Sequence, residues 1–288
     1  MTFSVEQPRV DELENVIKML RSWQFDGSPV QLHPGDLGWF WRFGPDELAR
    51  ALRVRTRNEQ IFAVGLLDEP DLLRLAVAPA VDTDEEFAHQ LVSDLMRPEQ
   101  GVLPPGTAYV EARSGESVRK LLLEAGWAPD ESWTPLSRSL SNPVERPEIR
   151  IEVVDAGLVA SRVAVQRAAF PNSTFTEDRW LTMASGAAYA DARCLLGFDA
   201  SDTAVAAITV WSAGVGRPGL IEPMGVHHDH RRRGYARAIT LAGAAALREL
   251  GSSSAVVCTR TQNVAAVAAY KSAGLRALPE VRDWRRDA

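Results

Sequence analysis

The alternation of apolar and polar residues along the chain predicts a similar series of strands and helices in each half. In the first half, the pattern predicts strands over 61–67, 72–77, 108–112 and 133–140, and helices over 9–20, 45–52, 85–96 and 116–125. In the second half, it predicts strands over 151–154, 193–198, 204–211, 220–226 and 255–259, and helices over 158–170, 176–183, 234–250 and 263–273. Near-continuous apolar strands, such as 61–67, are typical of a sheet covered on both faces. We therefore expect an α/β protein made of two tandem domains, each with a central mixed β-sheet flanked by helices.

A polar segment separates the two series. Residues 141–148 read Ser-Asn-Pro-Val-Glu-Arg-Pro-Glu, and two prolines in a polar run are typical of a linker. A chain of 288 residues also exceeds the usual size of one domain. We place the boundary near residue 145, which gives domains over 1–145 and 146–288.

Aromatic residues are dense at 38–43, which reads Gly-Trp-Phe-Trp-Arg-Phe. Such a cluster can stack on a planar ligand or pack in a core or between domains, and packing is the commoner use. Trp211, at the end of a predicted strand, can likewise line a pocket or pack in the core, and packing is the commoner use.

A basic loop joins the strand 220–226 to the helix 234–250. The loop ends with Arg231, Arg232, Arg233 and Gly234. Cations at the start of a helix oppose its dipole, whereas the free N–H groups of a glycine-containing loop and of a first helical turn bind anions. A phosphate or pyrophosphate is therefore the expected ligand, and a solvated run of arginines is the alternative.

This part of the chain resembles a known family. The spacing Arg231-x-x-Gly234-x-Ala236 after an apolar strand is similar to the coenzyme A pyrophosphate loop of the GNAT superfamily of acyl-CoA N-acyltransferases. A second signature of that superfamily is similar to Asn263-x-x-Ala266-x-x-x-Tyr270-x-x-x-Gly274-Leu275. The resemblance is specific over 151–287 and only architectural over the first half.

The resemblance implies that acetyl-CoA is the co-substrate and assigns residues to it. The pyrophosphate would lie on the loop and first helical turn. The backbone of the strand would pair with the pantetheine arm and the acyl carbonyl, and the helix that follows Asn263 would lie beside the pantetheine. The implied cofactor-binding residues are Met224, Gly225, Val226, Arg231, Arg232, Arg233, Gly234, Tyr235, Ala236, Asn263 and Ala266.

Two residues are candidates for acid and base catalysis. Glu222 is a carboxylate in an apolar strand, and Pro223 after it removes a backbone donor from the ladder. The resemblance implies that Glu222 is the general base; the alternative is a carboxylate paired with a cation or exposed at an edge. Tyr270 shares a helix face with Asn263 and Ala266. The resemblance implies that its phenol is the general acid, and the alternative is a core residue.

The first half lacks the basic loop. At the corresponding helix start it has Asp82, Asp84, Glu85 and Glu86, and no glycine. Carboxylates suit a helix N-terminus and repel a pyrophosphate. By resemblance, the first domain is a degenerate copy without a coenzyme site, and we expect it to be structural and to wall one side of the acceptor pocket.

Composition limits the partners and the compartment. A net charge of −6 argues against a nucleic-acid partner. Cys194 and Cys258 stand in apolar runs, which indicates buried thiols in a reducing compartment. With no apolar stretch of about 18 residues and no basic leader, we expect a cytoplasmic protein without a membrane partner.

Three loop histidines, His227, His228 and His230, invite a metal site. No cysteine or paired carboxylate completes a ligand set in the sequence pattern. We therefore expect no metal and interpret the histidines as loop residues near the phosphates.

The function expected from this resemblance is transfer of an acetyl group from acetyl-CoA to a primary amine of a small molecule. One alternative is acetylation of a cysteinyl pseudodisaccharide, as in mycothiol synthase, a tandem member of the superfamily. Another is a non-catalytic protein that binds and senses acyl-CoA. The acceptor, the acyl chain length and the oligomeric state remain open.

Overall fold

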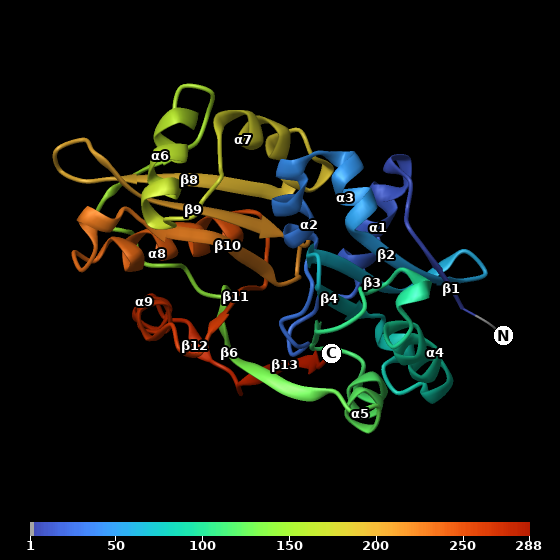
Figure 1. The fold of residues 1–288 in the computed structure, drawn as a ribbon. Coiled ribbons are helices and arrows are strands. Elements are labelled where there is room, and N and C mark those ends of the chain that lie inside the picture. Colours follow the sequence, from blue (N-terminus) through green and yellow to red (C-terminus); the bar gives the residue numbers. More distant parts are fainter. Residues whose placement is uncertain (1–2) are drawn as a thin grey trace.

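The computed structural model describes residues 3–288 (Figure 1), and within them thirteen strands form one continuous sheet. Its order is β1-β2-β3-β4-β5-β13-β6-β11-β10-β9-β8-β7, and β12 pairs with β6 beside this path. The strands are β1 (Ser4–Glu6), β2 (Leu52–Arg57), β3 (Gln60–Glu69), β4 (Leu72–Val77), β5 (Ala108–Ala112), β6 (Ala128–Ser139), β7 (Arg150–Val153), β8 (Ala192–Phe198), β9 (Ala204–Ser212), β10 (Gly219–Val226), β11 (Ser254–Arg260), β12 (Arg276–Ala277) and β13 (Val281–Arg286).

Helices cover both faces of this sheet. In Figure 1, α6 and α7 lie above the strands of the second half, and α8 and α9 lie below them. The helices are α1 (Leu13–Ser22), α2 (Pro34–Phe40), α3 (Pro45–Ala51), α4 (Glu85–Leu95), α5 (Glu116–Glu124), α6 (Val159–Ala169), α7 (Glu177–Ala184), α8 (Tyr235–Glu249) and α9 (Val264–Ser272), with 3-10 turns that include η2 (Trp41–Phe43), η5 (Ala187–Asp191) and η6 (His228–His230). The expected α/β class, a mixed sheet flanked by helices in two copies, is confirmed.

The two halves exchange their last strands. β6 comes from the first half, but its C-terminal part pairs with β11, from Trp133 opposite Arg260 to Ser139 opposite Ser254. β13 comes from the end of the chain but pairs with β5 of the first half, with Trp284 opposite Val110. The sheet order is therefore almost symmetric about the β13–β6 pair. The boundary near residue 145 remains a prediction. The strands at the centre of the sheet pair across this boundary, because β6 precedes it while β11 and β13 follow it.

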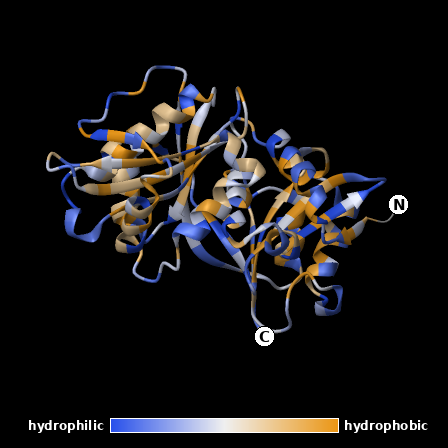
Figure 2. Ribbon diagram, turned by 90° about the horizontal axis from the view of Figure 1, so that it is seen from above, coloured by the Kyte–Doolittle hydropathy of each residue, from blue (hydrophilic) through white to orange (hydrophobic). Residues whose placement is uncertain are grey.

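Hydrophobic residues concentrate along the strands of both halves, while hydrophilic residues lie in the outer loops (Figure 2). One hydrophobic cluster includes residues of both halves, such as Leu37 and Phe40 of α2 with Trp180 and Trp211. A second cluster lies between α8 and the sheet of the second half. The core therefore joins the two halves.

α2 is the element through which the first half packs on the second. A Cβ atom on Gly35 would lie 2.5 Å from the Trp211 side chain, and one on Gly38 would lie 2.4 Å from it, so only glycine permits this approach. Upstream, buried His33 accepts a hydrogen bond from the Gly35 N–H on Nδ1 (2.9 Å) and lies 3.2 Å from the Pro218 carbonyl oxygen through Nε2. Burial lowers the pKa of His33 to about 3, so the neutral ring donates from Nε2 to Pro218.

The aromatic segment next to α2 packs between the halves, as the sequence predicted. The rings of Trp39 and Phe175 lie 5.2 Å apart, and Gly186 lies against Trp41. Trp211 is 1% exposed and also packs in the core. Cys194 is buried, and Cys258 is half-buried.

Across residues 3–288, none of the helices is both long enough and apolar enough to cross a membrane.

Candidate active site

β10 is interrupted at the position of Glu222. Its register with β9 shifts between Ile221, opposite Val210, and Met224, opposite Ile208, so β10 carries one extra residue there. Within the described chain, β10 pairs with β11 only at Gly219 and Leu220. The two parallel strands therefore separate beyond Leu220, and the β11-facing edge of β10 from Glu222 onward is left for another partner.

α8 begins without a side-chain cap. Gly234 is the N-cap residue with φ +84°, and a Cβ atom there would meet no atom within 4 Å. Glycine is thus required for its left-handed conformation rather than for space. Arg231, Arg232 and Arg233 are exposed beside this end of the helix, and Arg231 also donates to the Ala169 carbonyl (3.0 Å). Uncapped N–H groups and nearby guanidinium groups fit a pyrophosphate.

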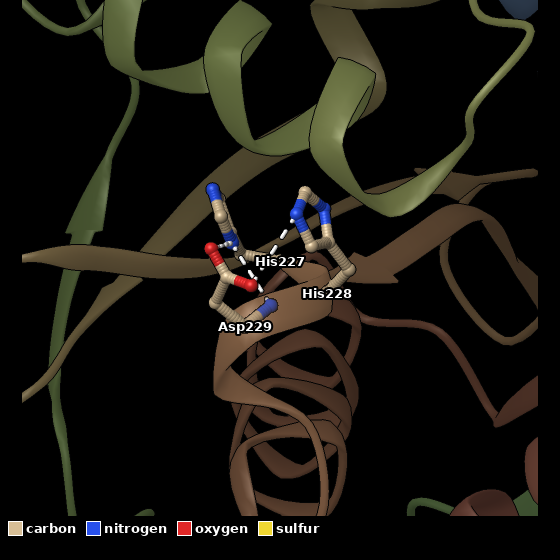
Figure 3. A group of neighbouring side chains, drawn as sticks. All are labelled: His227, His228 and Asp229. Carbon is tan, nitrogen blue, oxygen red and sulfur yellow. Dashed lines mark hydrogen bonds and ion pairs between the residues drawn. The ribbon is translucent and has the colours of Figure 1, made fainter.

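The histidine loop lies between β10 and α8 (Figure 3). Ligand atoms of His227, His228 and Asp229 all lie within 4.8 Å of one another. Asp229 thus places a carboxylate beside two imidazoles, and the expectation that the loop binds no metal stays a prediction. Both rings also have bonds within the protein: His227 Nδ1 accepts from the Asp229 N–H (3.3 Å), and His228 Nδ1 lies 2.9 Å from the Ala168 carbonyl oxygen.

A cavity of about 320 Å³ lies between the two halves of the chain. Predicted site residues of the second half that line it are Glu222, Met224, Asn263, Ala266 and Tyr270. Gly225, Val226 and residues 231–236 do not line it. Gly225 instead packs on α6, where an added Cβ would lie 2.6 Å from Ala169 Cβ. The basic loop at the start of α8 and the cavity lined by Glu222 and Tyr270 are thus separate parts of the region formed by β10, α8 and α9.

Glu222 is fixed at the bulge by its neighbours. The indole of Trp211 donates to the Glu222 backbone carbonyl (2.6 Å), and the side-chain carboxyl shares a hydrogen bond with the carboxyl of Asp36 on α2. Burial raises the pKa of Glu222 to about 8, the negative charge of Asp36 raises it further, and Arg74 opposes the rise. A hydrogen bond between two carboxyl groups requires one proton, so this pair carries one negative charge near neutral pH.

Tyr270 is 6% exposed and lines the same cavity from α9. Burial raises the pKa of its phenol, and the charge of Glu222 adds to the rise. The phenol therefore stays protonated at neutral pH and is suited to donate a proton. Asn263 caps α9, because its side-chain oxygen accepts from the Ala266 N–H (3.2 Å).

Charged residues of the first half and of β13 form the opposite wall, and the sequence analysis missed them. Arg74 contacts Asp36 (2.9 Å), Glu111 (3.3 Å) and Asp68 (3.6 Å). Arg113 contacts Asp283 (2.8 Å), which comes from β13, and lies 3.7 Å from Glu111. Arg74 and Glu111 are charged residues in apolar strands, which is the signal that identified Glu222 and could have identified them too.

Comparison with known proteins supports the resemblance found in the sequence. Residues 162–275 match the model of the acetyltransferase (GNAT) family. Residues 162–275 are therefore identified as a GNAT domain within the second half of the chain. No curated protein matches the chain.

Solved structures of GNAT proteins align with the GNAT domain and with the first half together. A GCN5-related N-acetyltransferase from Sphaerobacter thermophilus is 18% identical, with a TM-score of 0.59 over 99% of this chain and 95% of that one. A GNAT-family acetyltransferase from Colwellia psychrerythraea is 13% identical, with a TM-score of 0.61 over 100% of both chains. A tandem GNAT protein from the clavulanic acid biosynthesis pathway is 12% identical, with a TM-score of 0.58 over 99% and 98%. At these identities the likeness concerns the fold, and it confirms the tandem GNAT architecture predicted from the sequence.

Proposed function

We propose that this chain transfers an acetyl group from acetyl-CoA to a primary amine of a small molecule by direct attack. One observation carries the proposal: Glu222 and Tyr270 line a single cavity beside the interrupted strand β10 of a GNAT domain. A base and an acid thus lie on the two sides of the space where β10 and β11 separate.

The reaction needs no covalent intermediate on the protein. Ionised Glu222 takes a proton from the amine, whose nitrogen then attacks the thioester carbonyl. N–H groups of the β10 backbone around Met224 to Val226 stabilise the negative charge that develops on the carbonyl oxygen. The C–S bond breaks, and the Tyr270 phenol donates a proton to the leaving thiolate. The products are the acetylated amine and free coenzyme A.

We also propose that the coenzyme binds at the start of α8 and that the first half does not bind one. The corresponding helix of the first half, α4, is capped by its own acid, because Asp84 accepts from the Phe87 N–H (2.9 Å). Asp82 accepts from the Gly115 N–H (2.7 Å). This helix end is occupied and acidic, whereas the end of α8 is uncapped and basic. The first half then contributes a wall of the acceptor pocket.

Calorimetric titration with acetyl-CoA tests the coenzyme site. We expect one site per chain in the wild type and none in Gly234→Glu, which places a carboxylate at the pyrophosphate position. Gly216→Glu is the matched control, because Gly216 has φ +73° and open space around it but lies before the other end of β10. Two sites per chain would show that the first half binds coenzyme, and no binding would refute the proposal.

Release of free thiol from acetyl-CoA in the presence of amines tests the reaction. Amine-dependent release is expected to be lost in Glu222→Gln. A protein that binds acetyl-CoA but releases no thiol with any amine would be a sensor instead. Turnover confined to a cysteinyl pseudodisaccharide would select the mycothiol synthase-like alternative.

A further inference from the structure

The wall opposite Glu222 has an unusual charge balance. Five carboxylates line the cavity, from Asp36, Asp68, Glu111, Glu222 and Asp283, and two guanidinium groups face them, from Arg74 and Arg113. The carboxylates therefore outnumber the cations of the lining by three. Acidic residues are common on protein surfaces, but these five, which include the proposed base Glu222, line one cavity together with Tyr270, the proposed acid.

Protons and a neighbouring arginine offset only part of this excess. Glu222 and Asp36 share one proton. Arg42, on η2 behind the wall, interacts with Asp68 and Glu222. Its guanidinium is held over the rings of Trp39 (4.3 Å) and Phe43 (4.2 Å) and donates to the Trp39 carbonyl. One negative charge still has no counterpart among these groups.

The buried carboxyl of Asp36 is paired but not fully hydrogen-bonded. The Asp36 side chain is 1% exposed, and its Oδ1 forms an ion pair with Arg74 Nη2 at 2.9 Å. Within residues 3–288 this oxygen accepts no hydrogen bond of acceptable geometry. The ion pair offsets only part of the cost of burying the carboxylate, so a well-aligned donor from the cavity would stabilise it further.

Of Asp68, Glu111 and Asp283, Asp68 is the most accessible and has the longest closest contact with a guanidinium of the lining. Its side chain is 33% exposed, and its closest cation in the wall is Arg74 Nη1 at 3.6 Å. Glu111 and Asp283 are 12% and 10% exposed, and each lies close to a guanidinium. A positively charged ligand group would therefore meet Asp68 first.

We infer that the acceptor carries a second basic nitrogen besides the amine that is acetylated, and that Asp68 holds this second, cationic group. The inference rests on the proposed function, since it names the substrate class of the same cavity. The proton that the reacting amine gives up ends on Glu222, and the charge count above already includes one proton on the Glu222–Asp36 pair, so this amine does not supply the missing positive charge. A second ammonium group has a pKa of about 10, so it stays charged at neutral pH and can supply this positive charge.

The cation would also help the base. Burial and neighbouring carboxylates favour the protonated form of Glu222 in the free protein. A positive charge in the cavity favours the ionised form, which is the one that accepts a proton from the amine. A dicationic acceptor would thus bind to the acidic wall and promote the ionisation of Glu222.

Amines of matched length test the inference by thiol release from acetyl-CoA. We expect kcat/KM for 1,4-diaminobutane to exceed that for butylamine by about 10- to 100-fold, the usual range for a hydrogen bond to a charged group. 4-Amino-1-butanol should resemble butylamine, and 4-aminobutanoate should be the poorest acceptor. Diamines with three, five and six methylene groups extend the series, so that one unsuitable length does not decide the result.

Two variants locate the cation. Asp68→Asn should lower the ratio of kcat/KM for the diamine to that for butylamine by about 10-fold or more, and the ratio cancels the effect of the Asp68 charge on Glu222. Glu69→Gln is the matched control, because Glu69 is the next residue of β3, is exposed and does not line the cavity. Equal turnover of diamines and monoamines, or a preference for diamines that survives in Asp68→Asn, would overturn the inference.

Direct binding separates this inference from the proposed function. Calorimetric titration of the coenzyme A-loaded protein with 1,4-diaminobutane and with butylamine needs no turnover. Tighter, Asp68-dependent binding of the diamine without acetylation of any amine would support the cation site and refute the acetyltransferase proposal. Acetylation of amines without preferential binding of the diamine would leave the function standing and refute the cation site.

Discussion

At the scale of single residues, Glu222 is the proposed base, and its protonation depends on a residue of the other half. Its carboxyl shares a proton with Asp36, and Asp36 is held by two further contacts, to Arg74 Nη2 (2.9 Å) and to the His33 N–H (2.6 Å). Arg42, Asp68 and Tyr270 also face Glu222. With a pKa of about 8, Glu222 is mostly protonated at pH 7 and becomes an effective base only as the pH rises.

The first prediction concerns pH. In the wild type, kcat/KM is expected to rise with pH through an apparent pKa of about 8, because the ionised form of Glu222 is the active one. In Asp36→Asn, the rise should occur at lower pH, because the neighbouring negative charge is gone and Arg74 remains. Asparagine still offers an oxygen to the His33 N–H. The same amine is used for both proteins, so that its own ionisation contributes equally.

The control for this measurement is Asp46→Asn, which removes an exposed carboxylate at the start of α3 and should leave the profile unchanged. A profile of Asp36→Asn that coincides with the wild type would show that Asp36 does not influence the base.

The second prediction concerns the acid. Tyr270→Phe removes one hydroxyl from the cavity and keeps the ring that packs beneath α9. We expect kcat to fall by about 100-fold or more, the usual contribution of a positioned acid, while the affinity for acetyl-CoA changes little. Tyr109→Phe, on β5 outside the cavity, is the control. Equal losses of coenzyme affinity and kcat would point to a structural role for Tyr270.

At the scale of elements, α2 and the bulge of β10 form one unit. α2 packs on Trp211 through Gly35 and Gly38, and Trp211 donates to the Glu222 carbonyl. Asp36 lies between the two glycines in the sequence and reaches the cavity. The position of the base therefore depends on how closely a short helix of the first half approaches one tryptophan of the GNAT domain.

The third prediction tests this contact. In Gly38→Ala, the added Cβ would lie 2.4 Å from the Trp211 ring, so the helix or the ring must shift. Overpacking of this kind costs about 1–3 kcal/mol, which lowers Tm by roughly 2–4 °C per kcal/mol in a chain of this size. We also expect kcat to fall, because the shift displaces Trp211 and Asp36, the two residues that hold Glu222.

Gly157→Ala is the control for thermal unfolding and kcat, because the nearest atom to its Cβ would be 3.4 Å away. If Gly38→Ala unfolds at a lower temperature but keeps full kcat, the contact contributes to stability without positioning Glu222.

The elements that the sequence predicted are those whose pattern is local. Strands such as β4 and β5 and helices such as α8 and α9 lie within one or two residues of their predicted bounds. α2 was missed, because Pro-Gly-Asp-Leu-Gly-Trp-Phe contains two glycines, poor helix formers that are explained only by the approach to Trp211. β13 was missed, because Val-Arg-Asp-Trp-Arg-Arg is too polar to suggest a central strand.

The candidate site likewise contains residues that the sequence predicted and residues that it did not. The motifs identified Glu222, Asn263, Ala266 and Tyr270 of the second half, which the cavity brings together. Asp36, Asp68 and Asp283 were not identified, because the cavity brings them to residues more than 100 positions away: Asp36 and Asp68 face Glu222, and Asp283 pairs with Arg113. Short-range spacing carries no information about such contacts.

At the scale of the whole molecule, the exchange of strands makes the two halves interdependent. β13 brings Asp283 to buried Arg113 of the first half (2.8 Å), and Arg286 donates to the Leu95 carbonyl (2.7 Å). The end of the chain therefore completes both the sheet of the first half and the charged wall of the cavity.

The last prediction follows from this exchange and uses a chain that ends at Leu278, without β13. If β13 belongs to the sheet of the first half, its removal leaves β5 at an edge, although β5 lies about 170 residues away in the sequence. We expect amide hydrogen exchange to accelerate in Ala108–Ala112, which contains the partners of Trp284, Arg285 and Arg286. β2 is the internal control, because it pairs with β1 and β3 and should keep its protection. Loss of protection confined to residues after 146 would contradict the exchange, since a C-terminal strand that stayed in its own half could not protect β5.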